Sequence, residues 1–201
     1  MTCIIRKINR IFNRNKSKKT YPIIVNPSYM DHIYGAGIVF MNEYHILTGL
    51  QTKYCKRKIF DIITGLGGKK EGNETVIETG IREILEELFE FQNNQITPNL
   101  ILKLYLGIVP KKCINVNGYV MIICDFDDLL FILKEVHILK SPLYDTMPLT
   151  IWDLIIKRKI NVNMIKQEIC QLCLLPVNTN LNNWKNEYML KDFINDMAFI
   201  I

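Results

Sequence analysis

The spacing of apolar residues changes along the chain, and each change marks a predicted element. Two short runs rich in apolar and β-branched residues, 34–40 and 44–50, predict a strand pair or hairpin. Residues 59–63 predict a further strand, which the glycine-rich run 65–68 ends. From residue 75 to residue 89 the spacing becomes helical. These patterns predict one long helix that follows several strands.

The second half of the chain continues the mixture. Residues 100–109 and 118–126 predict strands on either side of a turn at Pro110. Residues 184–201 predict a closing amphipathic helix. Three other segments have helical or mixed character: 129–139, 150–157 and 163–175. Interleaved strands and helices predict an α/β fold with a mixed sheet between helices.

Composition indicates one compact domain with extensions. The chain has 201 residues, of which 49% are hydrophobic, enough for one sizeable core. We expect a domain at residues 21–201, preceded by a basic arm at residues 1–20. The bases of this arm are Arg6, Lys7, Arg10, Arg14, Lys16, Lys18 and Lys19. Such an arm attracts RNA phosphates, although a solvated tail or a helix on a membrane surface also fits its pattern.

Two further features concern the compartment. No apolar run approaches the roughly 18 to 20 residues that span a bilayer, so we expect no transmembrane segment. The six cysteines are scattered through apolar segments, and no cleavable signal pattern is visible. These observations favour a reducing, cytoplasmic location.

The most informative segment is 67–88, because it concentrates carboxylates. On a helix, Glu83, Glu86 and Glu87 share one face at positions i, i+3 and i+4. Like charges at this spacing repel by a few tenths of a kcal/mol per pair, and a bound cation removes that penalty. Clustered carboxylate oxygens favour Mg²⁺ or Mn²⁺, which commonly share their ligands with substrate phosphates.

The residues around these carboxylates also have expected roles. Gly67 and Gly68 allow a tight turn and bring the main chain close to a metal ion or a phosphate. Arg82 is placed to orient a carboxylate through a charge-assisted hydrogen bond, or to form an ordinary surface ion pair. The apolar residues at 77, 81, 84, 85 and 88 fall on the opposite face and are expected to pack on the sheet.

This segment resembles the Nudix box, G-x5-E-x7-R-E-U-x-E-E-x-G-U, where U is bulky and apolar. The matching residues are Gly68, Glu74, Arg82, Glu83, Ile84, Glu86 and Glu87. The chain departs from the pattern after the metal positions, where Phe89 replaces the glycine and Glu90 replaces the apolar residue. We therefore expect the helix to end differently or run longer, with Phe91 supplying the missing apolar contact.

The resemblance implies a Nudix-type α/β/α sandwich with extra C-terminal helices and a metal-dependent pyrophosphohydrolase activity. Glu83, Glu86 and Glu87, with the Gly68 carbonyl, would bind Mg²⁺ or Mn²⁺, and Arg82 would belong to the catalytic group. Glu86 is our candidate base, and Glu135 is the candidate from a later segment, followed by Asp127 and Asp128. The supporting residues would be Glu74, Glu71 and Gly67.

The substrate is narrowed by features outside the box. The basic arm, the heavy use of Ile, Asn and Lys, and the long segment after the box make the chain loosely similar to the mRNA-decapping Nudix enzymes of poxviruses and other large DNA viruses. The expected substrate is then capped RNA, with release of 7-methyl-GDP. The candidates for stacking on the base are Tyr105, Tyr119, Trp152 and Trp184. The alternatives are a free nucleotide or diphosphoinositol phosphate substrate, or a non-catalytic module that binds RNA or a nucleotide.

Overall fold

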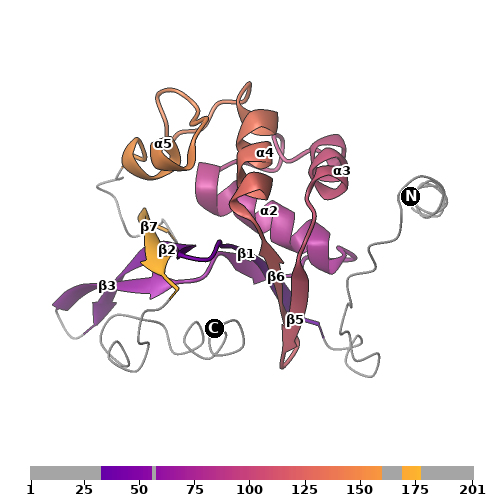
Figure 1. Cartoon of the computed structure of the whole chain (residues 1–201), viewed down its shortest axis with the longest axis horizontal. Helices are drawn as coiled ribbons and strands as arrows, with labels where there is room; N and C mark the ends of the chain where they lie inside the picture. The colour runs from indigo at the N-terminus through magenta and orange to yellow at the C-terminus, as the bar shows by residue number, and fades with distance from the viewer. Residues whose placement is uncertain (1–32, 56–57, 160–168, 178–201) are drawn as a thin grey trace.

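The computed structural model describes residues 33–55, 58–159 and 169–177, and the side chains of residues 53–61 lie outside this description. Figure 1 shows helices gathered on one side of two β-sheets. The elements in chain order are β1 (Gly35–Phe40), β2 (His45–Cys55), β3 (Lys58–Thr64), β4 (Gly67–Lys69), α2 (Val76–Phe89), α3 (Pro98–Gly107), β5 (Lys112–Val116), β6 (Tyr119–Cys124), α4 (Phe126–Val136), α5 (Ile151–Ile156) and β7 (Gln171–Pro176).

The strands form a mixed sheet and an antiparallel sheet. The four-stranded sheet has the order β4-β1-β6-β5, in which β1 is parallel to β6 while the other pairs are antiparallel. The three-stranded sheet has the order β3-β2-β7, and both of its pairs are antiparallel. Strand β1 thus lies at the centre of the mixed sheet, next to the short strand β4 that leads into α2.

The predicted strands at 34–40 and 44–50 are confirmed, but the predicted hairpin between them is wrong. Strands β1 and β2 belong to different sheets, and an isolated bridge between Met41 and Ile46 joins them. The side chain of Asn42 accepts hydrogen bonds from the backbone N–H groups of Tyr44 and His45, which shapes the turn. Both edges of β1 are already paired with β4 and β6, so β2 pairs with β3 and β7 instead.

The strand predicted at 100–109 is also wrong, because this segment contains helix α3. The side-chain oxygen of Thr97 accepts a hydrogen bond from the backbone N–H of Leu100 at 3.2 Å, and Pro98 occupies the first turn. Both features are typical of a helix start. The segment 163–175, predicted to be helical or mixed, contains strand β7 in its described part.

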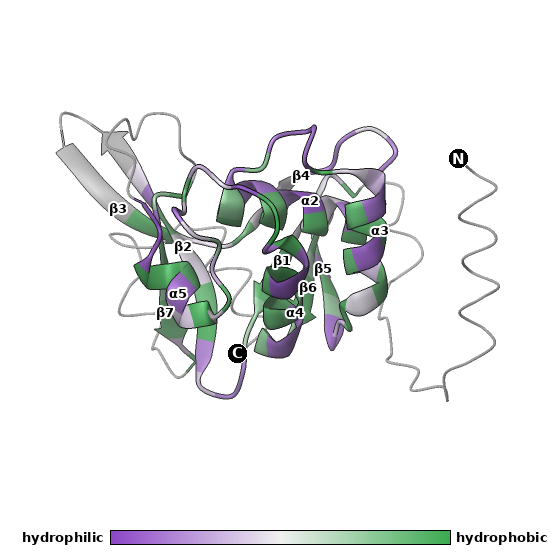
Figure 2. Cartoon of the chain, turned by 90° about the horizontal axis from the view of Figure 1, so that it is seen from above, coloured by the Kyte–Doolittle hydropathy of each residue, from purple (hydrophilic) through white to green (hydrophobic). Residues whose placement is uncertain are grey.

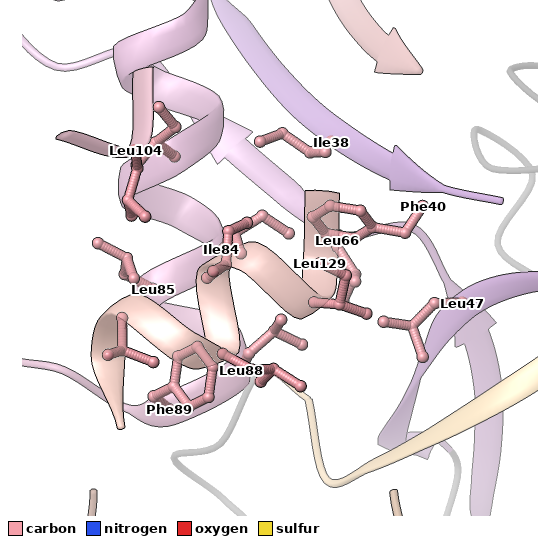
Figure 3. Packing of buried hydrophobic residues seen from close by; sticks show 14 of the residues in the cluster. Ile38, Phe40, Leu47, Leu66, Ile84, Leu85, Leu88, Phe89, Leu104 and Leu129 are labelled. Atoms are coloured by element: carbon pink, nitrogen blue, oxygen red, sulfur yellow. The ribbon is translucent and has the colours of Figure 1, made fainter. Parts of the chain in front are cut away.

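The core lies between the helices and the mixed sheet (Figure 3). Helix α2 buries Ile84 and Leu88 completely, and Ile38 of β1 is 1% exposed. Leu129 brings α4 into the same cluster, near Phe40 at the end of β1. Figure 2 shows that α2, α3 and α4 each carry both hydrophilic and hydrophobic residues, as expected of helices that cover a sheet. This packing holds α2 against the mixed sheet.

The mixed α/β class is confirmed, with a mixed sheet and four helices among the described residues. Helices α2 and α4 share one core cluster with β1 and β6. The described residues therefore form a layer of helices packed on the mixed sheet. In the described ranges no helix is long and apolar enough to cross a membrane. The predicted arm at 1–20 and the predicted helix at 184–201 lie outside the described residues.

Candidate active site

Local sequence at the start of α2 sets where the helix begins and how closely it approaches the sheet. The Thr75 side chain accepts a hydrogen bond from the backbone N–H of Glu78 at 3.3 Å, and the Glu78 carboxylate accepts one from the Thr75 N–H at 2.7 Å. This capping box satisfies two backbone donors at the helix end. Gly80 then faces Ile38 and Ile122, where an added Cβ would lie 3.0 Å from each side chain. This close approach holds the start of α2 against β1 and β6, and Glu83 and Glu87 of the following turns lie beside β4.

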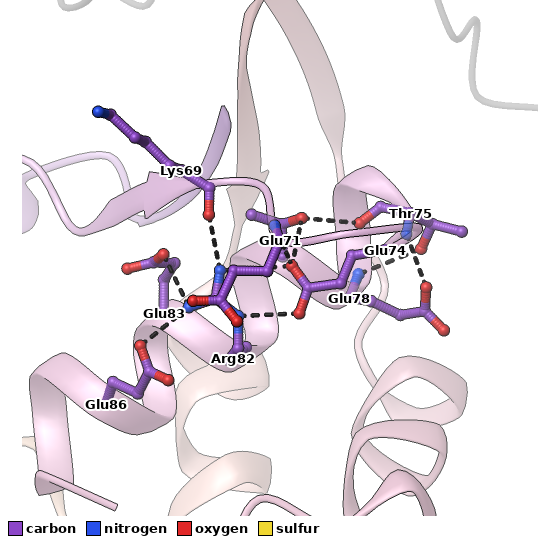
Figure 4. Close-up of polar contacts among 9 residues, drawn as sticks. Lys69, Glu71, Glu74, Thr75, Glu78, Arg82, Glu83 and Glu86 are labelled. Atoms are coloured by element: carbon purple, nitrogen blue, oxygen red, sulfur yellow. Dashed lines mark hydrogen bonds and ion pairs between the residues drawn. The ribbon is translucent and has the colours of Figure 1, made fainter. Parts of the chain in front are cut away.

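Arg82 lies at the centre of the carboxylates (Figure 4). Its side chain is 8% exposed. The Nε atom donates to Oε1 of Glu74 at 2.8 Å, and Nη1 lies 2.9 Å from Oε1 of Glu83 and 2.9 Å from Oε2 of Glu86. The Nη2 atom donates to the Lys69 carbonyl at 2.7 Å and to Oε2 of Glu74 at 3.3 Å. One guanidinium therefore joins three carboxylates and the end of β4.

Glu74 is held in turn by its neighbours. Its Oε2 atom accepts hydrogen bonds from the Glu71 N–H at 3.0 Å and from the Thr79 hydroxyl at 3.1 Å. Glu74 therefore fixes Arg82 from the loop before α2, as a supporting residue would. The predicted supporting residue Glu71 takes part through its backbone, and its side chain is exposed.

Two glycines of β4 bring the main chain against the other carboxylates. The Gly67 N–H donates to Oε2 of Glu87 at 2.7 Å. A Cβ added at Gly68 would lie 2.4 Å from Oε2 of Glu83, so the Glu83 carboxylate occupies the space of a side chain. Gly67 also has a φ of +143°, which favours glycine. Strand β4, which the sequence reasoning missed, thus places its backbone over Glu83 and Glu87.

Burial and Arg82 shift the acid strengths of these groups in opposite directions. Burial by itself raises the pKa of Glu74, but hydrogen bonds from Arg82 and from the Glu71 backbone outweigh it and leave the pKa lowered. For Glu86, burial dominates and raises the pKa although the charge of Arg82 opposes it. Burial also works to lower the pKa of Arg82, yet the hydrogen bond to Glu74 and the neighbouring negative charges raise it.

The donor set suits a hard divalent cation. Glu83, Glu86 and Glu87 offer carboxylate oxygens, and Gly68 lies directly against the Glu83 carboxylate. Oxygen donors of this kind match Mg²⁺ and Mn²⁺. In the described part of the chain, no three acidic, His or Cys side chains are already gathered as a metal-binding group, since Glu83 and Glu86 both face Arg82.

Acidic residues outside the box have other contacts. Glu135 of α4 forms an ion pair with Lys103 of α3, and its role as a catalytic residue stays a prediction. Asp128 is buried, and its carboxylate accepts hydrogen bonds from the backbone N–H groups of Val109 and Asp125. Burial raises the pKa of Asp128. Asp128 therefore helps to cap the start of α4, while a catalytic role of Asp127 or Asp128 stays a prediction.

The aromatic candidates are dispersed over the structure. Tyr119 lies beside Tyr34, with 6.1 Å between ring centroids, and its hydroxyl occupies the space where a Cβ of Gly67 would lie. Tyr105 is partly buried against the core, and Trp152 on α5 is 65% exposed. Trp184 and the bases of the arm lie outside the described residues. Among the described candidates, Tyr119 lies against the glycine strand next to the carboxylates.

The end of α2 differs from the expected glycine stop. The helix runs through Phe89, and Glu90 adopts the left-handed conformation with φ 52°. Phe91 is 2% exposed and stacks on Phe89, which confirms that it supplies the missing apolar contact. Sequence reasoning missed the buried Arg158, which binds this helix end. Its place in a run of basic residues gave no signal of burial.

Comparisons with known proteins give a weak structural likeness. No protein-family model and no curated protein matches the chain. Two crystal structures of a bifunctional NMN adenylyltransferase/ADP ribose pyrophosphatase from Francisella tularensis are similar to it. The complex with AMP and Mn ion has a TM-score of 0.42 and 16% identity, covering 99% of this chain and 46% of that one. The other has a TM-score of 0.43 and 15% identity, covering 99% and 45%. The chain thus spans less than half the length of these structures.

Proposed function

We propose that this chain is a metal-dependent hydrolase that cleaves a pyrophosphate linkage in a nucleoside diphosphate derivative, and that its fold is of the Nudix type. The observation that supports this proposal most is the arrangement around Arg82. Glu74, Glu83 and Glu86 surround one buried guanidinium, and the Gly67 N–H binds the carboxylate of Glu87. The residues that match the Nudix pattern thus lie together in space.

In this proposal, Glu83, Glu86, Glu87 and the Gly68 carbonyl would hold Mg²⁺ or Mn²⁺. When bound, the ion would neutralise negative charge that develops on the phosphoryl group. Arg82 has a different task, because its contacts with Glu83 and Glu86 orient those carboxylates. The excess of carboxylates over the single arginine supports cation binding at this surface.

Glu86 is the residue that we propose as general base. Among the carboxylates paired with Arg82, its side chain is the most exposed at 33%, compared with 19% for Glu74 and 10% for Glu83. It is therefore the best placed of the three to contact an attacking water. Glu86 would take the proton of that water while the oxygen bonds to phosphorus and the bond to the leaving phosphate breaks. Glu135 is the second candidate for this role.

For the substrate we propose the 5′ cap of mRNA, with 7-methyl-GDP as the product. The support comes from charge: the chain has a formal net charge of +5, and its first 20 residues are rich in bases. Positive charge attracts the phosphates of an RNA chain in addition to those of the cap. A free nucleotide or diphosphoinositol phosphate needs no such arm. Whether the enzyme requires an RNA chain attached to the cap therefore distinguishes a decapping enzyme from a hydrolase of small molecules.

The test compares product release from cap-labelled RNA, free cap analogue and a panel of nucleotides, each with Mg²⁺ or Mn²⁺. Glu87→Gln is expected to lose at least about 100-fold in rate, because a lost metal contact weakens stabilisation by several kcal/mol. Glu43→Gln, at an exposed turn, makes the same charge change elsewhere and is expected to keep its rate.

Each outcome has a distinct meaning. Release of 7-methyl-GDP from RNA by the wild type, with loss in Glu87→Gln, supports decapping. Turnover of small diphosphates alone would overturn the RNA substrate and keep the hydrolase. If the wild type turns over nothing with either metal, the enzymatic proposal is wrong and a binding module takes its place.

A further inference from the structure

The last carbonyl groups of α2 are bound by side chains from distant parts of the chain. Carbonyls at a helix C-terminus have no partner inside the helix. Arg158 donates from Nη2 to the Glu87 carbonyl at 2.8 Å and from Nη1 to the Leu88 carbonyl at 2.9 Å. The Ser141 hydroxyl donates to the Phe89 carbonyl at 2.6 Å. Two residues beyond α4 thus complete the end of α2.

Arg158 is unusual because it is buried. The residue is 8% exposed, and within the described residues its hydrogen bonds go to uncharged oxygens. Besides α2, Nη2 binds the Ile169 carbonyl at 2.8 Å, and Nη1 lies 3.5 Å from the Tyr144 hydroxyl. Its Nε atom is buried without a hydrogen-bond partner among the described residues. Burying a charge in this way is costly, and the negative end of the α2 dipole offsets part of the cost.

Arg158 and β4 hold the same glutamate from opposite ends. The Gly67 N–H binds the Glu87 carboxylate at 2.7 Å, and Arg158 binds the Glu87 carbonyl at 2.8 Å. Helix ends open more readily than helix centres, because the last carbonyls are not held by the helix itself. The contact with Arg158 therefore limits movement of the turn that carries Glu86 and Glu87.

We propose that Arg158 is a positioning residue for the candidate active site. It keeps the last turn of α2 helical, so that the Glu87 carboxylate keeps its hydrogen bond from the Gly67 N–H and its position one turn after Glu83. The Arg158 side chain contacts backbone carbonyl groups of α2, so it acts on the site through Glu87. The inference rests on the proposed function where Glu87 is taken as a metal ligand, whereas the hold on Glu87 is a property of the fold.

The test uses Arg158→Lys, which keeps the charge and loses the fork of donors. The control is Ser141→Ala, which removes a hydrogen bond from the same helix end but at Phe89 instead of Glu87. The first measurement is hydrogen exchange of the Gly67 amide in metal-free protein, relative to the amide of Ile122 inside the mixed sheet. A residue that only stabilises the whole fold would change both amides alike, so the ratio isolates the effect on Glu87.

We expect the exchange of Gly67 relative to Ile122 to rise about tenfold in Arg158→Lys, because the turn that carries Glu87 then opens more often. It is expected to stay within about twofold in Ser141→Ala, because Ser141 holds Phe89 and not Glu87. The second measurement is Mn²⁺ binding followed by electron paramagnetic resonance. There the concentration for half saturation is expected to rise about tenfold in Arg158→Lys, as for other residues that orient ligands. Arg158→Gln is the second variant if the lysine variant does not fold.

The outcomes separate this inference from the proposed function. Unchanged relative exchange of Gly67 in the Arg158 variants would overturn the positioning role, whatever the metal does. Faster exchange together with no Mn²⁺ binding by the wild type would leave the hold on Glu87 in place and overturn the metal-dependent function. Faster exchange with unchanged Mn²⁺ binding would show that Arg158 does not position the metal site, and would also overturn the inference.

Discussion

Alanine at position 68 tests whether the close contact between β4 and α2 serves the position of Glu83. An added Cβ would lie 2.4 Å from Oε2 and 2.5 Å from both Cδ and Oε1 of that carboxylate. Gly68 is not among the described residues with positive φ, so its backbone accepts alanine. The effect of the substitution therefore falls on Glu83 and not on the main chain.

The size of the effect follows from these distances. Non-bonded carbon atoms rest about 3.5 to 4.0 Å apart, so Glu83 has to move by about 1 Å. Its Oε1 atom now lies 2.9 Å from Nη1 of Arg82, and such a movement breaks that contact. Overpacking of this kind costs about 1 to 3 kcal/mol of stability. A displacement of about 1 Å in an active site lowers the rate by about 100-fold.

The assay is a double-mutant cycle read by urea unfolding and by metal-dependent hydrolysis. Gly68→Ala is expected to cost about 1 to 3 kcal/mol in the wild type and less than about 0.5 kcal/mol in Glu83→Ala, where the clashing carboxylate is gone. The control is Gly72→Ala, where φ is +49° and nothing lies within 4 Å of the added Cβ. It is expected to lose about 1 to 2 kcal/mol through backbone strain and to keep its rate.

Equal costs of Gly68→Ala in the two backgrounds would refute the clash with Glu83 as the cause. A variant that loses stability but hydrolyses at the rate of the wild type would refute a different step, namely that the position of Glu83 matters for activity. Rate and stability therefore test separate parts of the reasoning.

Two further predictions concern Arg82 and Asp128. Arg82→Lys is expected to lose about 1 to 3 kcal/mol in urea unfolding and at least about tenfold in rate, because one ammonium cannot bind Glu74 and the Lys69 carbonyl as the planar fork does; unchanged stability would contradict this. Asp128→Ala is expected to lose about 1 to 3 kcal/mol by leaving the Val109 N–H without its acceptor, while the rate per folded molecule stays within about twofold. A 100-fold fall in that rate would place Asp128 in the active site.

Helix α2 and its acidic face were predictable because both depend on neighbours within a few residues. Thr75 and Glu78 form a capping box across three positions, and the apolar spacing selects the face that packs on the sheet. The helix was expected at 75–89 and lies at Val76–Phe89. The grouping of Glu83 and Glu86 on one side of it follows from helix geometry alone.

Other elements were not predictable from local patterns. Residues 100–109 are apolar at most positions, so their spacing does not separate a buried strand from a buried helix. The short strand β4 has no apolar alternation, and its pairing with β1 is what makes it a strand. Strand β1 pairs with β4 and β6, and β2 pairs with β3 and β7. These pairings depend on which strands from distant parts of the chain reach each edge, and local spacing does not encode that.

The sequence by itself therefore determined the carboxylate face of α2, and it led to the prediction of a divalent ion there. Only the tertiary structure decided what holds that face in place. Gly67 reaches Glu87 across 20 positions of the chain, and Arg158 reaches the same residue across 71. Contacts over such separations depend on how the sheet and helices pack, because no local spacing relates the two residues. For this reason a buried arginine that completes a helix end looks, in the sequence, like any basic residue on the surface.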